Sequence, residues 1–327
     1  MQSQDYPNAK WGVAQRTDGA TEADLDRAFD AGAIVRTHVL RPTWHFVAPE
    51  DLRWLLALTA PRVHQANAYQ YRLLEIDREV TARSRRVIEK ALRGGVSLTR
   101  EELRQALERD GVLGSGLRLG YLIIDAELEG VVCSGPRRGK RHTYALLEER
   151  LPSAPARTRD ETLAELARRY VEGHGPAQVA DLAWWSGLTV AVARSALESA
   201  TPPLVRETVD DRTFWTSPTQ PAPRFTPPVV HLLPNYDELL IAFRDRTDAM
   251  DPALPPPARV AQVVLAHIVV RDGLGVAGFR RRDEKAATTL SIDLLVELDA
   301  AERDAIRAAA ERFAVFLGRE VRLVGLD

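Results

Sequence analysis

PAQVADLAWWSGLTVAVARSALESA, residues 176–200, predicts two helices joined by a short turn at Gly187. A glycine-bearing turn between two helices is the signal of a helix-turn-helix. The next stretch, PLVRETVDDRTFWTSP at residues 203–218, predicts a β-hairpin with two aspartates at its tip. A helix-turn-helix followed by a hairpin is the outline of a winged helix. In this outline Trp184 and Trp185 are interpreted as core residues.

A similar plan occurs upstream. SLTREELRQAL, residues 97–107, predicts a helix that starts with a capping box between Thr99 and Glu102. GLRLGYLIIDAELEG, residues 116–130, predicts a second and more apolar helix. VVCSGPRRGKRHTYALL, residues 131–147, predicts a strand, a basic turn and a strand. We interpret this region as another winged helix.

The first 95 residues predict helices and one hairpin, which we interpret as a first winged helix with long connecting helices. Thr21 is the expected N-cap of the first helix. The reversal of the hairpin is expected around Pro42, because proline is common in turns. The expected elements are a helix at 21–34, strands at 34–40 and 44–47, a helix at 49–60 and a longer helix at 61–93.

A proline-rich connector at residues 217–228 leads to a C-terminal part with a different pattern. The expected elements there are a strand and short helix at 229–246, strands within 260–282 that turn at Asp272-Gly273, a strand at 289–298, a helix at 299–318 and a strand at 320–324. We therefore predict an α+β fold: three tandem winged helix-turn-helix domains with a C-terminal β-rich, barrel-like domain. The predicted domain boundaries are 1–95, 96–155, 156–218 and 219–327.

The composition is that of a globular protein of two or three domains, with 327 residues, 45% of them hydrophobic and 28% charged. A net charge of −2 argues against a surface that is basic everywhere, although it allows a local basic groove. The single cysteine, Cys133, excludes an intramolecular disulfide and indicates a reducing compartment. No apolar run reaches the roughly 18 residues of a membrane span. We expect a cytoplasmic protein.

The sequence contains none of the common catalytic motifs. Its seven histidines show neither HxxxH nor HExxH spacing, which argues against a zinc site. It has no GxSxG and no Walker loop. DGLGVAGFRR, residues 272–281, has Gly-x-Gly-x-x-Gly spacing, but a strand-like run follows where a dinucleotide site needs a helix. We interpret these glycines as part of a hairpin and expect neither a metal nor a cofactor.

Two clusters of cations are candidates for contacts with DNA phosphates. PRRGKR, residues 136–141, would be the wing, the loop of a winged helix that reaches along a DNA backbone. The alternative is an ordinary solvated hairpin tip. The second cluster is a run of three arginines beside a strand end. The candidate DNA-binding residues are Arg137, Arg138, Lys140, Arg141, Arg280, Arg281 and Arg282.

A third charged stretch is PNYDELLIAFRDR, residues 234–246. Asp237 and Glu238 are followed there by Arg244-Asp245-Arg246. Alternating charges of this kind more often form a structural ion-pair network than a catalytic site. We interpret the stretch as such a network, and the roles of its individual residues stay open.

The chain starts with MQSQDY, in which Gln2 and Gln4 flank Ser3. Glutamine is neutral and cannot act as a strong general base, but its carbonyl can orient a water and its amide can donate hydrogen bonds. Its partially negative oxygen can also stabilise a developing cation. These properties suit a reaction whose leaving group already carries positive charge, such as the loss of an N7-alkylated purine from its sugar. Taken alone, the triplet has little specificity.

Several stretches taken together resemble one family. They are QSQDY at 2–6 with AKWGVAQR at 9–16, IVRTHVLRPTWHFVAPEDLRWLL at 34–56, LEGVVCSGPRRGKRHTYALLEERLP at 128–152 and LLPNYDELLIAFRDR at 232–246. The chain resembles the winged helix DNA-binding proteins of the AlkZ type, a group that includes bacterial DNA glycosylases. The resemblance covers nearly the whole chain. It implies three tandem winged helices and a β-rich domain around a concave basic channel, and removal of bulky N7-alkylpurines or, in some members, unhooking of interstrand crosslinks.

The resemblance also implies a catalytic element, a Gln–apolar–Gln triplet near the N-terminus. Gln2 and Gln4 match its two glutamines, and Ser3 stands at the position that is usually apolar. Gln4 would position water or stabilise the sugar cation, with Gln2 assisting. The family pattern has a helical segment before the triplet, so we expect the first winged helix to lack its first helix here.

Two other functions are compatible with tandem winged helices. One is a non-catalytic DNA-binding or transcription-regulatory protein, and the other is a scaffold that binds proteins. The glycosylase interpretation expects a monomer whose partner is alkylated double-stranded DNA.

Overall fold

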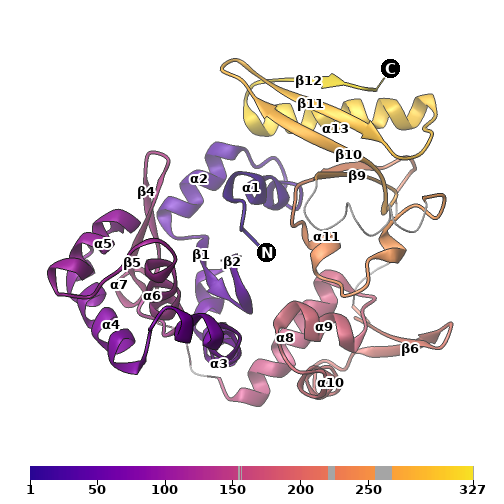
Figure 1. The fold of residues 1–327 in the computed structure, drawn as a ribbon. Coiled ribbons are helices and arrows are strands. Elements are labelled where there is room, and N and C mark those ends of the chain that lie inside the picture. The colour runs from indigo at the N-terminus through magenta and orange to yellow at the C-terminus, as the bar shows by residue number, and fades with distance from the viewer. Residues whose placement is uncertain (154, 156, 220–224, 255–266, 327) are drawn as a thin grey trace. The chain divides into compact units, whose positions relative to one another are not determined.

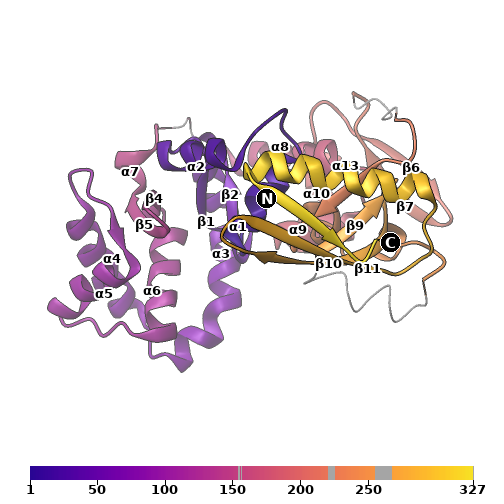
Figure 2. The same cartoon turned by 90° about the horizontal axis from the view of Figure 1, so that it is seen from above.

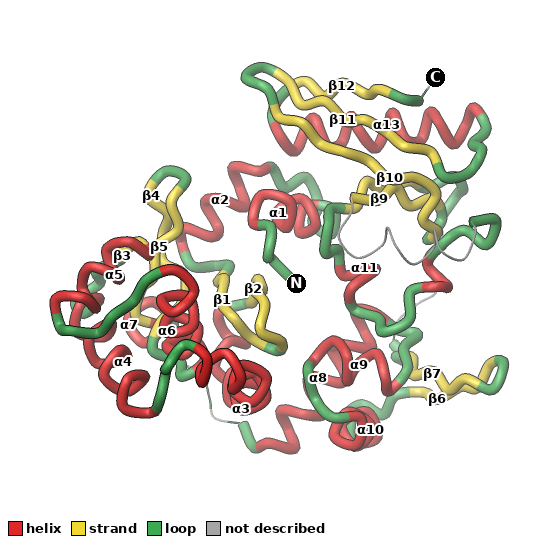
Figure 3. Tube along the Cα trace, in the orientation of Figure 1, coloured by secondary structure: helices red, strands yellow, loops and turns green. Residues whose placement is uncertain are grey.

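The computed structural model describes residues 1–326 except 154, 156, 220–224 and 255–266. It contains both helices and strands (Figures 1 and 3). The chain divides into two compact units. Unit 1 comprises Met1–Leu25, Val171–Trp184 and Val205–Asp327, and unit 2 comprises Asp26–Tyr170 and Trp185–Leu204.

The elements up to residue 150 are α1 (Tyr6–Ala14), α2 (Glu22–Ala31), β1 (Val35–Val39), β2 (Arg41–Val47), α3 (Pro49–Leu73), α4 (Arg78–Leu92), β3 (Leu98–Thr99), α5 (Arg100–Arg109), α6 (Gly116–Leu128), β4 (Val132–Arg138), β5 (Arg141–Leu146) and α7 (Leu147–Arg150). Those that follow are α8 (Arg159–His174), α9 (Val179–Ser186), α10 (Val190–Glu198), β6 (Val205–Val209), β7 (Arg212–Thr216), β8 (Val230–Leu233), α11 (Glu238–Ile241), the 3₁₀ turn η1 (Thr247–Ala249), β9 (His267–Arg271), β10 (Leu274–Asp283), β11 (Ala287–Leu294), α13 (Ala300–Leu317) and β12 (Glu320–Val324).

A curled five-stranded sheet in the order β12-β11-β10-β9-β8 forms the centre of unit 1. Strands β11 and β12 run parallel, and the other neighbours are antiparallel. The β9–β10 hairpin turns at Asp272 and Gly273, both at positive φ, as predicted. The part of the expected strand before His267 lies outside the described residues. This sheet confirms the predicted α+β class and its β-rich C-terminal part.

Helix α13 lies along one face of this sheet (Figures 1 and 2). A capping box between Asp299 and Glu302 starts the helix, and Gly318 at a φ of 64° ends it. Helix α1 packs against α13, because the Trp11 ring lies 4.8 Å from Phe313 and 5.1 Å from Phe316 between centroids. The indole N–H of Trp11 donates to the Leu232 carbonyl of β8 at 2.6 Å. The N-terminal helix is therefore fixed to elements more than 200 positions later in the chain.

The hairpin of β1 and β2 in unit 2 reverses one or two residues earlier than expected. Leu40 alone connects the strands, at a φ of 66°, and the register shifts between His38 and Val39. The prediction of a turn at Arg41-Pro42-Thr43 was wrong, because Pro42 is part of β2. Proline lacks the amide needed for a regular ladder and is accommodated at such irregular positions.

Helix α3 differs from the expectation as well. It runs without interruption through Pro61 to Leu73, so the predicted boundary at residue 61 was wrong. A proline inside a helix costs about 3 kcal/mol, but buried residues on both sides of it, including Leu58 and Val63, keep the helix on the core. The real break follows at Glu75, which has a φ of 53°, and Asp77 caps the next helix.

Helices α4, α5 and α6 of unit 2 pack with a three-stranded sheet in the order β3-β5-β4. The predicted capping box between Thr99 and Glu102 is present at the start of α5. The core between these elements contains fully buried leucines and isoleucines, including Ile88, Leu103 and Leu122.

The turn between α9 and α10 is at Gly187, as predicted, with a φ of 73°. A Cβ at this position would lie 2.6 Å from the Leu40 carbonyl oxygen, closer than any side chain tolerates. Arg62 donates to the Gly187 carbonyl at 3.3 Å, so α3 also contacts the turn. Strands β6 and β7 form the expected hairpin, with Asp210 and Asp211 at positive φ at its tip. Among the described residues no helix is long and apolar enough to cross a membrane.

Candidate functional site

The Gln2-Ser3-Gln4 triplet lies in unit 1 immediately before α1. Gln2 and Ser3 are buried, with exposed fractions of 8% and 0%, whereas Gln4 is exposed. The backbone N–H of Gln2 donates to Oε1 of Glu238 at 2.8 Å. Asp5, directly after the triplet, caps α1 by accepting from the Asn8 backbone and from its side-chain amide. The triplet is therefore a short segment with one glutamine inside unit 1 and one at its surface.

Glu238 belongs to the stretch that the sequence interpreted as an ion-pair network. Asp237 caps the short helix α11, accepting from the Leu239 backbone at 2.9 Å. Its two carboxylate oxygens also accept from the Arg16 guanidinium, at 2.8 and 3.0 Å. Asp237 is 1% exposed and Glu238 6%. Asp237 therefore has the expected structural role, whereas Glu238 contacts the N-terminal segment.

The other end of α11 is held by side chains of unit 1. Trp184 donates its indole N–H to the Ile241 carbonyl at 3.0 Å. Arg246 donates to the Leu240 carbonyl at 2.7 Å, and the backbone N–H of Arg244 donates to Asp181 at 2.9 Å. Trp184 is 45% exposed, so its interpretation as a core residue was wrong. Both termini of α11 are thus fixed, although the helix has a single turn.

A histidine lies on the far side of Glu238. Nε2 of His174, at the end of α8, is 3.5 Å from Oε2 of Glu238. The ring of His174 meets Phe243 edge to face, with 6.4 Å between centroids. Glu238 therefore lies between the Gln2 amide and the His174 imidazole, two groups that can donate to its two oxygens.

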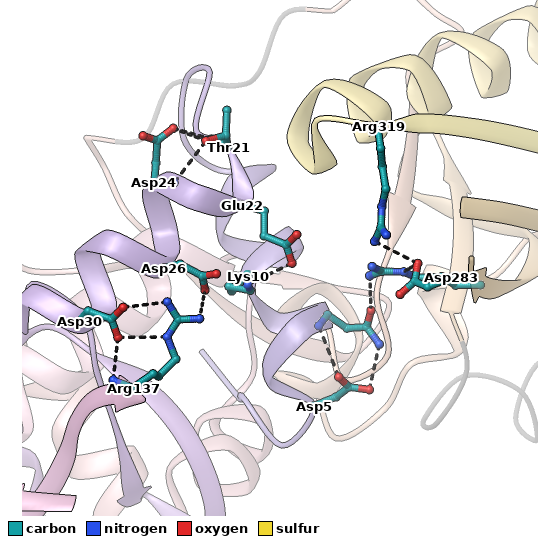
Figure 4. Close-up of polar contacts among 12 residues, drawn as sticks. Asp5, Lys10, Thr21, Glu22, Asp24, Asp26, Asp30, Arg137, Asp283 and Arg319 are labelled. Atoms are coloured by element: carbon teal, nitrogen blue, oxygen red, sulfur yellow. Dashed lines mark hydrogen bonds and ion pairs between the residues drawn. The ribbon is translucent and has the colours of Figure 1, made fainter. Parts of the chain in front are cut away.

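The four cations of the predicted wing, in unit 2, do not form one uniform surface. Arg137 turns inward and pairs with Asp26 at 2.9 Å and Asp30 at 2.8 Å, both on α2 (Figure 4). Its hydrogen bonds hold the pKa of Asp30 below the ordinary value. Arg137 therefore connects strand β4 to helix α2.

The remaining wing cations are at the surface. Arg138 pairs with Glu102 and lowers the pKa of that carboxyl to about 2. Lys140 and Arg141, at the hairpin tip, are both exposed. The structure thus separates Arg137 from the three outward cations of the predicted wing.

The arginines of β10 alternate in the same way, because successive side chains of a strand point to opposite faces. Arg280 and Arg282 have side-chain exposures of 78% and 82%. Arg281 has only 9%, pairs with Asp283 and lies over the Phe313 ring. It also donates to Asn8 at 3.1 Å, and its partner Asp283 accepts from Arg319 as well (Figure 4). The run of three arginines therefore contains two exposed cations, Arg280 and Arg282, and one cation with a structural role, Arg281.

Unit 2 contains a buried pair that the sequence did not single out. Glu127 of α6 is 0% exposed, and its Oε2 lies 2.5 Å from Nδ1 of His38. Burial raises the pKa of Glu127 against the opposing effects of His38 and Arg36. The Arg36 guanidinium and the His38 ring both lie against Trp44. No local sequence signal marks this cluster, since its members come from β1, β2 and α6.

A cavity of about 350 Å³ lies in unit 1 between α1, β8 and α13. Trp11, His231, Arg312 and Phe316 line it together with residues after α1, and neither Gln2 nor Gln4 does. Burial and the nearby Arg312 lower the pKa of His231. Within the described residues, no group of three histidine, cysteine, aspartate or glutamate side chains could hold a metal ion.

Comparisons with known proteins found similarity over nearly the whole chain. A sequence model of the family described as DNA glycosylase AlkZ-like matches residues 1–316. The solved structure of Streptomyces sahachiroi DNA glycosylase AlkZ superposes with a TM-score of 0.77 at 21% identity, covering 99% of this chain and 91% of that one. At that identity the likeness shows the fold. No curated protein matches the sequence.

Proposed function

Because the chain belongs to the AlkZ-like DNA glycosylase family and is therefore a DNA-binding repair enzyme, we propose that it removes bulky N7-alkylated purines through Gln2 and Gln4. The observation that carries this proposal is the placement of the two glutamines. They lie on a segment whose backbone is held by a buried carboxylate, with Gln4 at the surface where a substrate can reach it. The family match also favours an enzyme over the non-catalytic regulator and the scaffold.

The chemistry requires little acid catalysis. Alkylation at N7 puts a positive charge on the purine, so the base leaves as a neutral molecule and the sugar becomes the cation. The enzyme has to stabilise that cation and place a water beside it. The Gln4 amide can do both through its carbonyl oxygen, and Gln2 assists from the buried side. Ser3 lies between them and is completely buried.

Unhooking of interstrand crosslinks is part of the same proposal. A glycosylase that swings a base into a closed pocket cannot process a purine that is covalently bonded to the opposite strand. A catalytic side chain at the protein surface avoids this restriction. The exposure of Gln4 therefore supports action on bulky and crosslinked purines.

DNA contacts are proposed for the exposed cations. In this proposal residues 1–95, 96–155 and 156–218 act as winged helices and residues 219–327 as the β-rich domain. The phosphate-binding residues are Arg138, Lys140, Arg141, Arg280 and Arg282, because these five are exposed. Arg137 and Arg281 would support the wing and the sheet through their ion pairs. We further propose that the protein acts as a monomer on chromosomal DNA in the nucleoid.

Base release tests the proposal directly. The enzyme is incubated in excess with three DNA duplexes, which carry one 7-methylguanine, one bulky N7-alkylguanine or one N7-linked crosslink. Abasic sites are scored after alkaline cleavage. We expect release of the bulky base, and a loss of about 100-fold or more in Gln4→Ala with DNA binding retained. Gln105→Ala, an exposed glutamine on α5, is the matched control. Undiminished release by Gln4→Ala would remove Gln4 from the mechanism.

Salt dependence tests the phosphate contacts. Each one contributes about 0.9 to the slope of log Kd against log salt concentration. Lys140→Ala should reduce the slope by about this amount, and Arg137→Ala should leave it unchanged. Equal effects of the two variants would contradict the division between outward and inward arginines.

A further inference from the structure

We infer that Asn235 and Glu238 are positioning residues that hold the Gln2–Asp5 segment at both ends. The inference rests on the proposed function, because it names the residues that hold the segment containing the same two glutamines. The sequence placed Glu238 in a structural charge network and left its role open, and it did not single out Asn235. In the structure they contact the residues at the two ends of that segment.

The first contact is at Gln2. Oε1 of Glu238 accepts from the Gln2 backbone N–H at 2.8 Å, and both residues are buried. A hydrogen bond to a carboxylate is about twice as strong as one between neutral groups. It fixes the main chain of Gln2 and leaves the orientation of its side chain to the surroundings.

The second contact is at Asp5. Nδ2 of Asn235 donates to Oδ2 of Asp5 at 3.3 Å, and Asn8 donates to the same oxygen at 2.8 Å. Asp5 is the N-cap of α1, so this contact sets the point at which the triplet enters the helix. Gln4 lies between the two fixed residues.

Both contacts come from a stretch that is itself rigid. Asp237 is fixed by Arg16, and the carbonyls at the end of α11 accept from Trp184 and Arg246. Helix α1 lies close to this stretch, because a Cβ at Gly12 would lie 3.4 Å from Oδ2 of Asp237. Reacting groups need support of this kind, since a small displacement of a catalytic side chain lowers the rate strongly.

Glu238 is accordingly a positioning residue and not a catalytic one. Its side chain accepts from the Gln2 backbone and lies within ion-pair distance of the Met1 amino group and of His174. Removing it should lower the rate of base release at saturating enzyme without weakening DNA binding. A residue that only stabilises the fold would change the unfolding midpoint in proportion to any loss of activity.

The experiment measures single-turnover base release, duplex affinity and urea unfolding for Glu238→Ala, Glu238→Gln, Asn235→Ala and the double variant Asn235→Ala/Glu238→Ala. We expect the rate to fall by up to about 100-fold in Glu238→Ala and by less in Asn235→Ala. Affinity should be unchanged in both. Glu238→Gln keeps an oxygen that can accept from Gln2 and should recover a large part of the rate.

A stability control separates positioning from folding. Ile306→Val removes one methyl group from the buried face of α13, away from the triplet, and should lower the unfolding midpoint with a wild-type rate. If Ile306→Val loses as much activity as Glu238→Ala, or if Glu238→Gln is no better than Glu238→Ala, the inference is overturned. Additive losses in the double variant would also contradict it, because two ends of one segment should be coupled.

A readout without substrate keeps this inference distinct from the proposed function. In protein labelled with ¹⁵N-glutamine, the Gln2 amide resonance, assigned with Gln2→Asn, should move in Glu238→Ala while that of Gln105 does not. If this occurs and wild-type protein releases no alkylated base, the proposed function fails and the positioning contact stands. If base is released and the Gln2 resonance is unaffected, the positioning inference fails.

Discussion

Glu127 in unit 2 and Glu238 in unit 1 are both buried carboxylates beside a histidine, but they differ in what the second oxygen contacts. Oε2 of Glu127 meets His38, and its Oε1 has no hydrogen-bond partner among the described residues. Glu238 meets His174 with one oxygen and accepts from the Gln2 backbone with the other. Burial and a histidine partner alone therefore do not identify a functional carboxylate. The feature that distinguishes Glu238 from Glu127 is its hydrogen bond to the Gln2 backbone, on which the proposed positioning role rests.

The largest expected effect is on the stability of unit 2. Glu127→Ala leaves His38 buried without its carboxylate, and breaking a buried pair in this way costs about 3–5 kcal/mol. We expect a corresponding loss in the free energy of urea unfolding, measured by circular dichroism. Glu320→Ala, at an exposed ion pair, is the control and should stay within about 0.5 kcal/mol of wild type. An equally small effect for Glu127→Ala would show that the pair is not needed for folding.

Glu238→Ala should destabilise the protein less. It removes one hydrogen bond to a charged group, which is worth about 1.5–3 kcal/mol. In the same urea experiment Glu238→Ala should lose clearly less free energy of unfolding than Glu127→Ala. Its rate of base release should nevertheless fall more than that of Glu127→Ala. The contrast between the glutamates would disappear if both variants lost stability and activity in the same proportion.

The pH dependence of stability tests the environment of Glu127. Its pKa is raised in the folded protein, so the folded state binds more protons than the unfolded state above pH 4.5, the carboxyl's ordinary pKa. The carboxyl therefore makes its full contribution to the free energy of unfolding below pH 4.5. This contribution is lost as the pH rises through the raised pKa, by at most about 1.4 kcal/mol per pH unit. Glu127→Gln lacks this loss. Its stability relative to wild type should rise with pH, and a constant difference would contradict the raised pKa.

The smallest expected effect is that of His174. The 3.5 Å separation from Glu238 is long for a hydrogen bond, and the His174 side chain is 16% exposed. His174→Gln should lower stability by less than about 1 kcal/mol. Base release should fall less than in Glu238→Ala, because the contact with the Gln2 backbone remains. A larger fall would place His174 among the residues that support the triplet.

Local signals in the sequence predicted much of the fold. The capping box at Thr99 and the glycine after α13 act within one turn of helix, so the sequence reveals them. The reversal at Leu40 and the continuity of α3 through Pro61 were missed, because tertiary packing there outweighs the ordinary preferences of leucine and proline.

The candidate site was less predictable. Gln2 and Gln4 could be named from the resemblance, and the exposed cations from their charge. The contact between Gln2 and Glu238 could not be predicted, since the two residues are 236 positions apart in the sequence. The inward Arg281 could have been found from strand alternation, because its two neighbours on β10 point outward. The inward orientation of Arg137 could not be predicted, since its partners lie on a separate helix.

The close approach of Gly187 to the Leu40 carbonyl has a consequence for natural variation. Two connections far apart in the sequence share one small space, and neither can enlarge without displacing the other. In an alignment of homologues, any side chain at position 187 should occur together with a rebuilt connection after position 39. The pair would then be inherited as one unit, and a graft of either segment alone between distant homologues should fail to fold.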